Sequence, residues 1–129
     1  MKNFKKILTR NFEFNEKVNI IVGDNDSGKS TILEALDLVA NSCYRGKNLN
    51  QVISSDLFNE TVVQKFLEGD FSIGTLPEIL IEMYLEDCPE YRGKNNSLNK
   101  EEDGIYIRIC FDDELTKTYN DFISGGVTV

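Results

Sequence analysis

A short apolar run, a glycine-rich loop and a helical repeat follow one another near the start of the chain. Residues 18–22 read VNIIV, which is typical of a strand that is buried on both faces. After the loop, apolar side chains recur at helical spacing at Ile32, Leu36, Val39 and Cys43, with Leu33, Ala35 and Ala40 beside them. The pattern predicts a strand, a loop and then a helix from about Gly28 to Cys43 or Tyr44.

Two later stretches alternate between apolar and polar positions, as half-exposed strands do. The first covers residues 78–86 and the second covers residues 105–111. Each places apolar side chains at every second position, so we expect an antiparallel pair with one apolar face. These side chains are Ile79, Ile81, Met83 and Leu85 in the first stretch and Ile105, Ile107, Ile109 and Phe111 in the second. The polar segment 87–103 between them is expected to be a surface loop.

The remaining segments complete an α/β pattern. Residues 1–14 predict a strand or a strand pair beside the loop-bearing strand, followed by a turn at residues 15–17. A second helix is predicted over residues 56–68, with Asp56 as its N-cap and Gly69 just beyond its end.

Composition and charge exclude several classes of protein. The 129 residues are enough for one domain, and 40% of them are hydrophobic. The net charge of −8 disfavours direct binding to nucleic acid, so DNA is expected to be contacted only through other domains. Three cysteines lack metal-ligand spacing and histidine is absent, which argues against a zinc site. The sequence has no run of transmembrane length, so we expect no membrane association and a cytoplasmic location.

The loop after the apolar run carries the clearest chemistry. Residues 23–30 read GDNDSGKS and match the phosphate-binding pattern G-x-x-x-x-G-K-[ST] at every fixed position. Glycines allow the backbone N–H groups to approach phosphates closely, the lysine supplies positive charge to the β- and γ-phosphates, and the hydroxyl ligates Mg²⁺. ATP and Mg²⁺ are therefore the expected ligands, with Lys29 as the candidate catalytic residue and Ser30 as the metal ligand. The predicted nucleotide-binding residues are Gly23, Asp24, Asn25, Asp26, Ser27, Gly28, Lys29, Ser30 and Thr31.

Basic and amide side chains in the first segment admit two interpretations. These side chains are Asn3, Lys5, Arg10 and Asn11. They either lie close to the bound nucleotide or form a solvated strand edge, and the pattern does not decide between the two.

Hydrolysis also needs a carboxylate at the end of a strand to hold Mg²⁺ through water. The candidates are Asp112, Asp113 and Glu114, which follow the apolar residues 109–111. The alternation of the preceding strand, with Arg108 within it, instead favours a surface strand followed by a short helix over residues 114–123, capped by Asp112 or Asp113. No LSGG-like stretch is present.

The opening residues resemble those of a known class of ATPases. Asn3-Phe4-Lys5 and the stretch VNIIVGDNDSGKSTILEAL resemble the start of ABC-type ATPases of the SMC and recombination-repair kind. The pair Asp70-Phe71, the strand PEILIEMYLED, the GKNNSL loop and the strand IYIRICFDDE are similar to the N-terminal ATPase region of OLD-family (overcoming lysogenization defect) nucleases.

This resemblance implies a larger molecule. Family heads have a second lobe with the Walker B carboxylates, signature loop and switch histidine, and they hydrolyse ATP as dimers. In the OLD family the head is joined to a Toprim nuclease domain that cuts DNA. None of these features is identifiable before Val129, so residues 1–129 are expected to be the first lobe of such a head, with its flanking antiparallel sheet.

The leading hypothesis is a Mg-ATP-binding lobe that has little activity alone and works as a homo-oligomer or with a larger ATPase or nuclease chain. Two alternatives remain. One is a non-catalytic subunit or decoy that keeps the fold and exposes apolar strand edges to a partner. The other is a compact NTPase that uses Asp112, Asp113 or Glu114.

Overall fold

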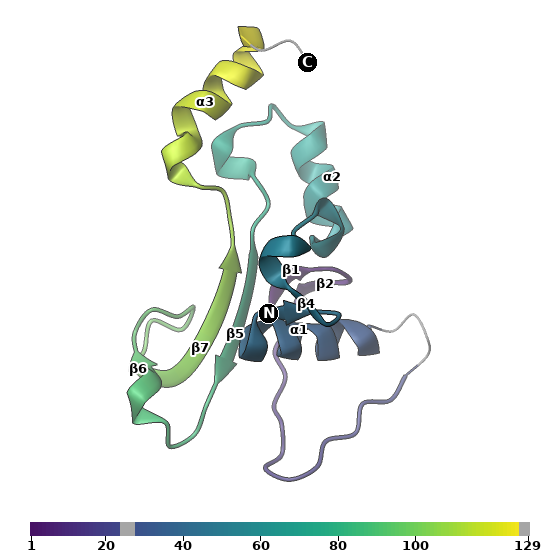
Figure 1. Cartoon of the computed structure of the whole chain (residues 1–129), viewed down its shortest axis with the longest axis vertical. Coiled ribbons are helices and arrows are strands. Elements are labelled where there is room, and N and C mark those ends of the chain that lie inside the picture. The colour runs from purple at the N-terminus through teal and green to yellow at the C-terminus, as the bar shows by residue number, and fades with distance from the viewer. Residues whose placement is uncertain (24–27, 127–129) are drawn as a thin grey trace.

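An antiparallel sheet forms the centre of the computed structural model, which describes residues 1–23 and 28–126 (Figure 1). Within that part of the chain the sheet has five strands in the order β2-β1-β5-β7-β6. Their bounds are Lys2–Phe4 for β1, Ile7–Thr9 for β2, Ile79–Tyr84 for β5, Arg92–Gly93 for β6 and Glu102–Ile109 for β7. A small hairpin of β3 (Cys43–Tyr44) and β4 (Lys47–Asn48) lies apart from it.

The predicted antiparallel pair is confirmed by β5 and β7. Their register runs from Ile79 opposite Ile109 to Tyr84 opposite Gly104. On the apolar side, Ile79 is fully buried and Ile81 is 3% exposed. Within residues 87–103, which were predicted as a loop, Pro89–Tyr91 form a 3-10 turn, Arg92–Gly93 form β6, and β7 already begins at Glu102.

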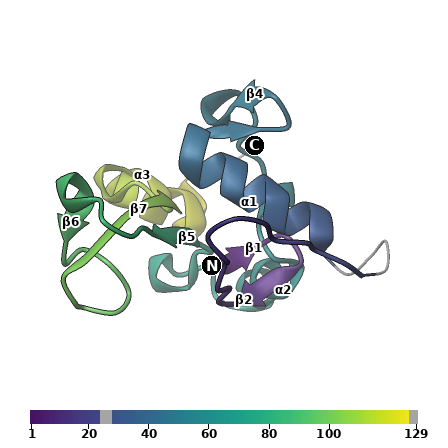
Figure 2. The same ribbon diagram turned by 90° about the horizontal axis from the view of Figure 1, so that it is seen from below.

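The predicted first helix is confirmed as α1 (Lys29–Asn41), but its buried face differs from the expected one. Leu33 is 59% exposed, whereas Leu38 is completely buried. The sheet decides this face, because α1 packs against Phe4 and the buried isoleucines of β5 (Figure 2). The core consists of Phe4, Ala35, Leu38, Val39, Leu57, Ile79 and Ile81.

The second helix, α2 (Glu60–Glu68), is shorter at its start than predicted. Residues Ser55–Leu57 form a separate 3-10 turn, and the N-cap is Asn59 instead of Asp56. The Asn59 Oδ1 accepts a hydrogen bond from Thr61 N at 3.0 Å, and its Nδ2 donates to Lys5 O at 2.9 Å. Asn59 therefore both caps α2 and joins it to the β1–β2 hairpin, a long-range contact that the local pattern did not reveal.

Replacing Asn59 with alanine should lower the free energy of unfolding by about 1–2 kcal/mol, because α2 loses its cap and the half-buried carbonyl of Lys5 loses a donor. Urea unfolding measures this loss. Asn48 caps only a short 3-10 turn and is exposed, so Asn48→Ala serves as the matched control with a smaller expected effect. Equal losses in the two variants would contradict the linking role of Asn59.

The last helical segment is confirmed in place, but Asp112 caps the 3-10 turn Asp113–Leu115 that precedes α3 (Thr116–Asp121), and within the described residues no side chain caps α3 itself. The Asp112 Oδ1 accepts a hydrogen bond from Glu114 N at 3.0 Å and so starts that turn. The Tyr119 hydroxyl donates to Phe71 O at 2.6 Å, which ties α3 to the segment after α2. These two helices lie at the same end of the long strands (Figure 1).

The prediction of a strand over residues 18–22 is wrong. No strand forms there, and Val18, Ile20 and Val22 are 71%, 82% and 83% exposed. Strand β1, which was expected to lie beside this run, pairs instead with β2 and β5. A strand needs a neighbour for its backbone groups, and no described segment supplies one here, so the run remains an extended arc (Figure 1).

Among the described residues, no helix combines the length and apolar character needed to cross a membrane.

Candidate nucleotide-binding site

The two ends of the predicted phosphate loop contact each other through a hydrogen bond. Gly28 has a φ of 90° and is the N-cap of α1, a backbone conformation that favours glycine. The Lys29 Nζ donates a hydrogen bond to the carbonyl oxygen of Gly23. The loop entrance and the helix start therefore lie close together. The predicted residues Asp24, Asn25, Asp26 and Ser27 lie outside the described part of the chain.

The first turn of α1 is prepared for an anion. Its first helical hydrogen bond runs from Ile32 N to Gly28 O at 3.2 Å. Within the described residues, no side chain caps this helix end and no acidic residue lies in its first turn. The N–H groups and the positive end of the helix dipole are therefore free to face a negative ligand.

Two hydroxyl residues at the helix start have different environments. Ser30 is exposed, so its hydroxyl is accessible to a metal ion that bridges to phosphates. Thr31 is 4% exposed, so its side chain is packed inside. The described residues contain no cluster of three or more His, Cys, Asp or Glu side chains that would hold a metal alone.

A hollow of about 230 Å³ lies next to this helix start. It is lined by Gly28 and Ile32 and, from the N-terminal segment, by Lys6, Arg10 and Phe12. Two cations and one aromatic ring suit an anion with a flat, aromatic portion. Sequence reasoning missed Lys6 and Phe12, because only the folded hairpin brings them beside the loop.

The polar residues predicted near a nucleotide separate into two groups. Arg10 lines the hollow, which agrees with the interpretation that places these side chains close to the bound nucleotide. Asn3 instead donates from Nδ2 to Glu78 O at 2.9 Å, and Lys5 binds Glu34, so both hold the fold together. Asn11 is exposed and is not part of the hollow.

A cluster of polar side chains joins α1 to the β1–β2 and β3–β4 hairpins. The Glu34 carboxylate accepts hydrogen bonds from Lys5 Nζ at 2.7 Å and from Arg45 Nε at 3.0 Å, and Lys5 also donates to the Tyr44 hydroxyl. Burial alone would raise the pKa of Glu34, but the hydrogen bonds and positive charges of Lys5 and Arg45 outweigh it and hold the pKa below its ordinary value of 4.5. Through Glu34, this cluster joins α1 to the turn between β1 and β2 and to the β3–β4 hairpin.

Replacing Glu34 with glutamine should destabilise the fold by about 1–3 kcal/mol near neutral pH. A carboxyl pKa that is lowered by folding adds stability above 4.5, and this stability is lost as the pH falls through the folded-state pKa. The loss on acidification should therefore be smaller in Glu34→Gln than in the unsubstituted chain. Urea unfolding at several pH values between about 3 and 7 measures it.

The matched control for that measurement is Glu13→Gln, since Glu13 is exposed and no cation partner is recorded for it in the described residues. The free energy of unfolding of Glu13→Gln should fall on acidification as much as that of the unsubstituted chain. An equal fall in Glu34→Gln would show that the Lys5–Glu34–Arg45 cluster does not contribute to the pH dependence of stability.

Comparison with known proteins reveals a family match over nearly the whole chain. The family described as "AAA domain" matches residues 1–124. The chain belongs to this family. No solved structure matches it at a significant level.

The AAA domain is also similar to curated proteins named DNA replication and repair protein RecF. Examples come from Francisella tularensis subsp. novicida (strain U112), subsp. holarctica (strain LVS) and subsp. tularensis (strain SCHU S4). Each is 38% identical over 55 residues, which is 42% of this chain and 16% of the relative. The matched region therefore spans about a sixth of the length of these relatives. Together the two findings indicate an ABC- or SMC-like P-loop ATPase.

The structure does not bring the alternative catalytic carboxylates to the phosphate loop of this AAA domain. Asp112, Asp113 and Glu114 are exposed at the start of the last helical segment. Strand β7 leads upward into the segment before α3, whereas the first turn of α1, which follows the phosphate loop, lies at the right of the view (Figure 1). Asp112 instead acts as a cap, which agrees with the surface-strand interpretation.

Proposed function

We propose that this AAA domain binds Mg-ATP through residues 23–31. Lys29 contacts the β- and γ-phosphates, and Ser30 ligates Mg²⁺. Backbone N–H groups of the first turn of α1 receive the phosphates. The observation that carries the proposal is the uncapped helix start, next to a glycine in left-handed conformation and a lysine that reaches back across the loop entrance.

Calorimetric titration of Mg-ATP into the full chain tests this proposal. Binding should be saturable and should weaken when EDTA removes the metal. Ser30→Ala should lose most of that metal dependence, whereas Ser55→Ala, an exposed serine in a 3-10 turn, should retain it. Binding that is unaffected by EDTA and by Ser30→Ala would contradict the metal role of Ser30.

We further propose that residues 1–129 form the first lobe of an OLD-like ATPase head. In the full-length molecule such a head would couple ATP binding and hydrolysis to DNA cleavage by a separate nuclease domain. Two observations support this: the RecF relatives are about six times longer than the matched region, and an apolar run lies exposed directly before the phosphate loop. A further lobe or a second copy of the chain would bury that run.

Hydrogen exchange at residues 18–22 tests this completion of the fold. We expect fast exchange at low protein concentration, because no backbone partner is recorded for these residues in the described structure. If the chain completes itself by association, protection should appear as the protein concentration rises. Fast exchange at all protein concentrations would indicate that a different chain, and not a second copy of this one, covers residues 18–22.

A second candidate function is a non-catalytic interaction module, which the exposed run and the remote carboxylates favour. This module and a compact NTPase that uses Glu114 differ in turnover. The module binds nucleotide without releasing phosphate, and Glu114→Gln leaves that result unchanged. A phosphate-release assay distinguishes them, because a compact NTPase would lose turnover in this variant.

A further inference from the structure

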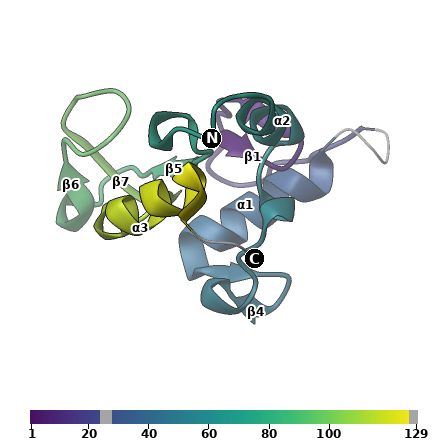
Figure 3. The ribbon, with the colours of Figure 1, turned by 90° about the horizontal axis from the view of Figure 1, so that it is seen from above.

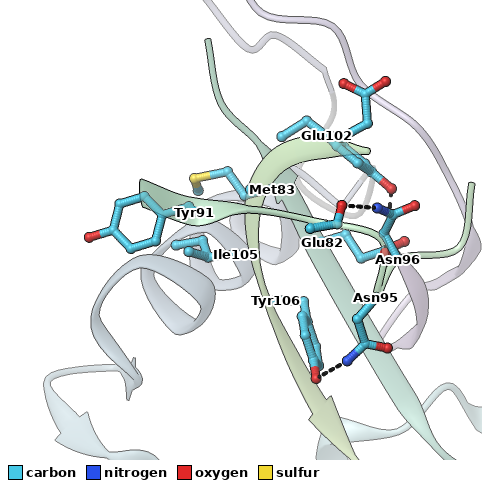
Figure 4. Close-up of a pocket in the computed structure, with 11 residues that line it drawn as sticks. Glu82, Met83, Tyr91, Asn95, Asn96, Glu102, Ile105 and Tyr106 are labelled. Atoms are coloured by element: carbon cyan, nitrogen blue, oxygen red, sulfur yellow. Dashed lines mark hydrogen bonds between the residues drawn. The ribbon is translucent and has the colours of Figure 1, made fainter. Parts of the chain in front are cut away.

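A second hollow, of about 180 Å³, lies on the part of the sheet farthest from the helix start that faces the predicted nucleotide (Figure 4). Strands β5 and β7 supply Tyr84 and Tyr106, and the segment between them supplies Tyr91 and Asn95. Strand β6 and the first turn of α1 lie on opposite sides of the molecule in both Figures 2 and 3. This hollow is therefore separate from the ATP site, and nothing proposed above uses it.

Two tyrosines, Tyr84 and Tyr106, lie on the same face of the β5–β7 pair as Glu82 and give the hollow an aromatic wall, whereas Tyr91 lies beside Met83 and Ile105 on its other side (Figure 4). Tyr84 and Tyr106 are 42% and 47% exposed. The Tyr106 hydroxyl accepts a hydrogen bond from Asn95 Nδ2 at 3.0 Å, which fixes the ring against the loop (Figure 4). Half-exposed tyrosine rings with a fixed orientation are typical of surfaces that bind other molecules.

A glycine lies where β7 approaches β5 closely, beside the hollow. A Cβ at Gly104 would lie 2.7 Å from the carbonyl oxygen of Met83, so a side chain at this position would force the strands to shift. The volume of the hollow suits one long side chain and is too small for a folded element.

The charge around the hollow is negative on balance, although the charge of Glu82 also acts on the N-terminal ammonium group of Met1 and Lys94 lies 3.9 Å from Glu101. Glu82 and Glu102 line the hollow, and the described residues show no cation bound to either. The nearby Arg92 is 3.3 Å from Asp103, so its charge is already paired. Residues 82–106 contain seven acidic and three basic residues, which gives half of the chain's net charge of −8.

Two details show that this negative charge acts at the hollow. The Glu82 carboxylate accepts hydrogen bonds from Ser97 N at 2.8 Å and from Ser97 Oγ at 2.5 Å, both neutral donors that leave its charge intact. Burial and the charges of Glu82 and Glu102 together raise the pKa of the Tyr84 hydroxyl.

We propose that this hollow binds an arginine side chain of a partner protein. A guanidinium group is planar, stacks on tyrosine rings and donates to carboxylates in its own plane, so it matches both features of the wall. Carboxylates at the rim repel the phosphates of nucleic acid, which makes single-stranded DNA stacked on the tyrosines the poorer ligand. The partner is therefore expected to present a basic segment, in keeping with the acidic surface around the hollow.

An NMR titration of the full ¹⁵N-labelled chain tests the proposal. The probe is the peptide acetyl-Gly-Arg-Gly-amide, and the matched control replaces arginine with citrulline, which has the same shape without the charge. The arginine peptide should shift the amide signals of Gly93, Gly104 and Tyr106 saturably. The citrulline peptide should bind about tenfold more weakly, because it loses the attraction to the carboxylates.

Variants separate the hollow from the general charge of the surface. Glu82→Gln/Glu102→Gln should weaken arginine binding about tenfold, whereas the control pair Glu86→Gln/Glu90→Gln, outside the hollow, should change it less than about twofold. If the double variant does not fold, Glu102→Gln alone replaces it. Glu102 is exposed and its side chain makes no hydrogen bond among the described residues, so this single variant should retain the fold. Tyr106→Leu should weaken binding about threefold to fivefold, and Tyr106→Phe, which keeps the ring but loses the hydrogen bond to Asn95, should weaken it less.

Three results would overturn the proposal. Equal binding of the arginine and citrulline peptides would remove the role of charge. Equal losses in the two glutamine pairs would show diffuse attraction without a site. Stronger shifts of the same amides by oligothymidine, unaffected by the glutamine substitutions, would identify the hollow as a stacking site for nucleic acid.

Discussion

Replacing Lys29 with alanine should abolish measurable Mg-ATP binding while leaving the fold intact. Lys29 is the one residue of the loop motif that brings a full positive charge, and its ammonium group already lies at the loop entrance against the Gly23 carbonyl. A bound triphosphate would offer that ammonium group stronger acceptors than a carbonyl oxygen. Losing one charged contact of this kind costs about 3 kcal/mol, or roughly 100-fold in affinity.

Stability should change little in this variant, because Lys29 is only partly buried and makes no contact with the core cluster. The matched control is Lys65→Ala, which removes an exposed lysine from the last turn of α2. Calorimetric titration and thermal unfolding of both variants measure affinity and stability separately. Retained Mg-ATP binding in Lys29→Ala would refute the proposed role of the loop, and a lowered melting temperature would show that its loss of binding reflects unfolding.

The parts of the fold that the sequence predicted are those decided by local chemistry. Strands β5 and β7 alternate strictly, so their pairing and apolar face followed from the sequence. The start of α1 followed from the glycine before it, and the last helical segment from the cap at Asp112. In each case the decisive residues lie within a few positions of the element that they define.

The parts that failed depend on residues far apart in the chain. The apolar run 18–22 has strand character, but a strand forms only where a neighbour offers hydrogen-bond partners. The buried face of α1 is chosen by Phe4 and β5, and the cap of α2 is Asn59 because its amide also reaches Lys5. Helical spacing and capping preference alone do not contain this information.

The candidate site shows the same division. The motif identified the loop residues by spacing, and the structure places Gly23, Gly28 and Lys29 together at the loop ends. Lys6 and Phe12 became visible only when the hairpin folded back beside α1. The only sequence signal for them was an aromatic residue two positions after Arg10 in a basic segment.

Replacing Phe4 with alanine should have the largest effect on stability of any single substitution considered. Its side chain is completely buried among residues of α1, β5 and the 3-10 turn before α2, so it joins three elements that are distant in the sequence. Truncating such a residue leaves a cavity that the surrounding backbone cannot fill, at a cost of about 3–5 kcal/mol. This is a large fraction of the roughly 5–15 kcal/mol that a domain usually has, and it should lower the melting temperature by about 10–20 °C.

The matched control is Phe14→Ala, since Phe14 is 48% exposed and lies outside the core cluster. Its loss should change the free energy of unfolding by less than about 1 kcal/mol. Urea unfolding of both variants, followed by circular dichroism, compares them directly. Because Phe4 also packs against α1, Phe4→Ala should weaken Mg-ATP binding in proportion to the fraction of unfolded protein. Urea that unfolds the same fraction of the unsubstituted chain should weaken Mg-ATP binding equally. A small loss of stability in Phe4→Ala would mean that α1 is held to the sheet mainly by the Lys5–Glu34 cluster, and Glu34→Gln would then have to be the more damaging substitution.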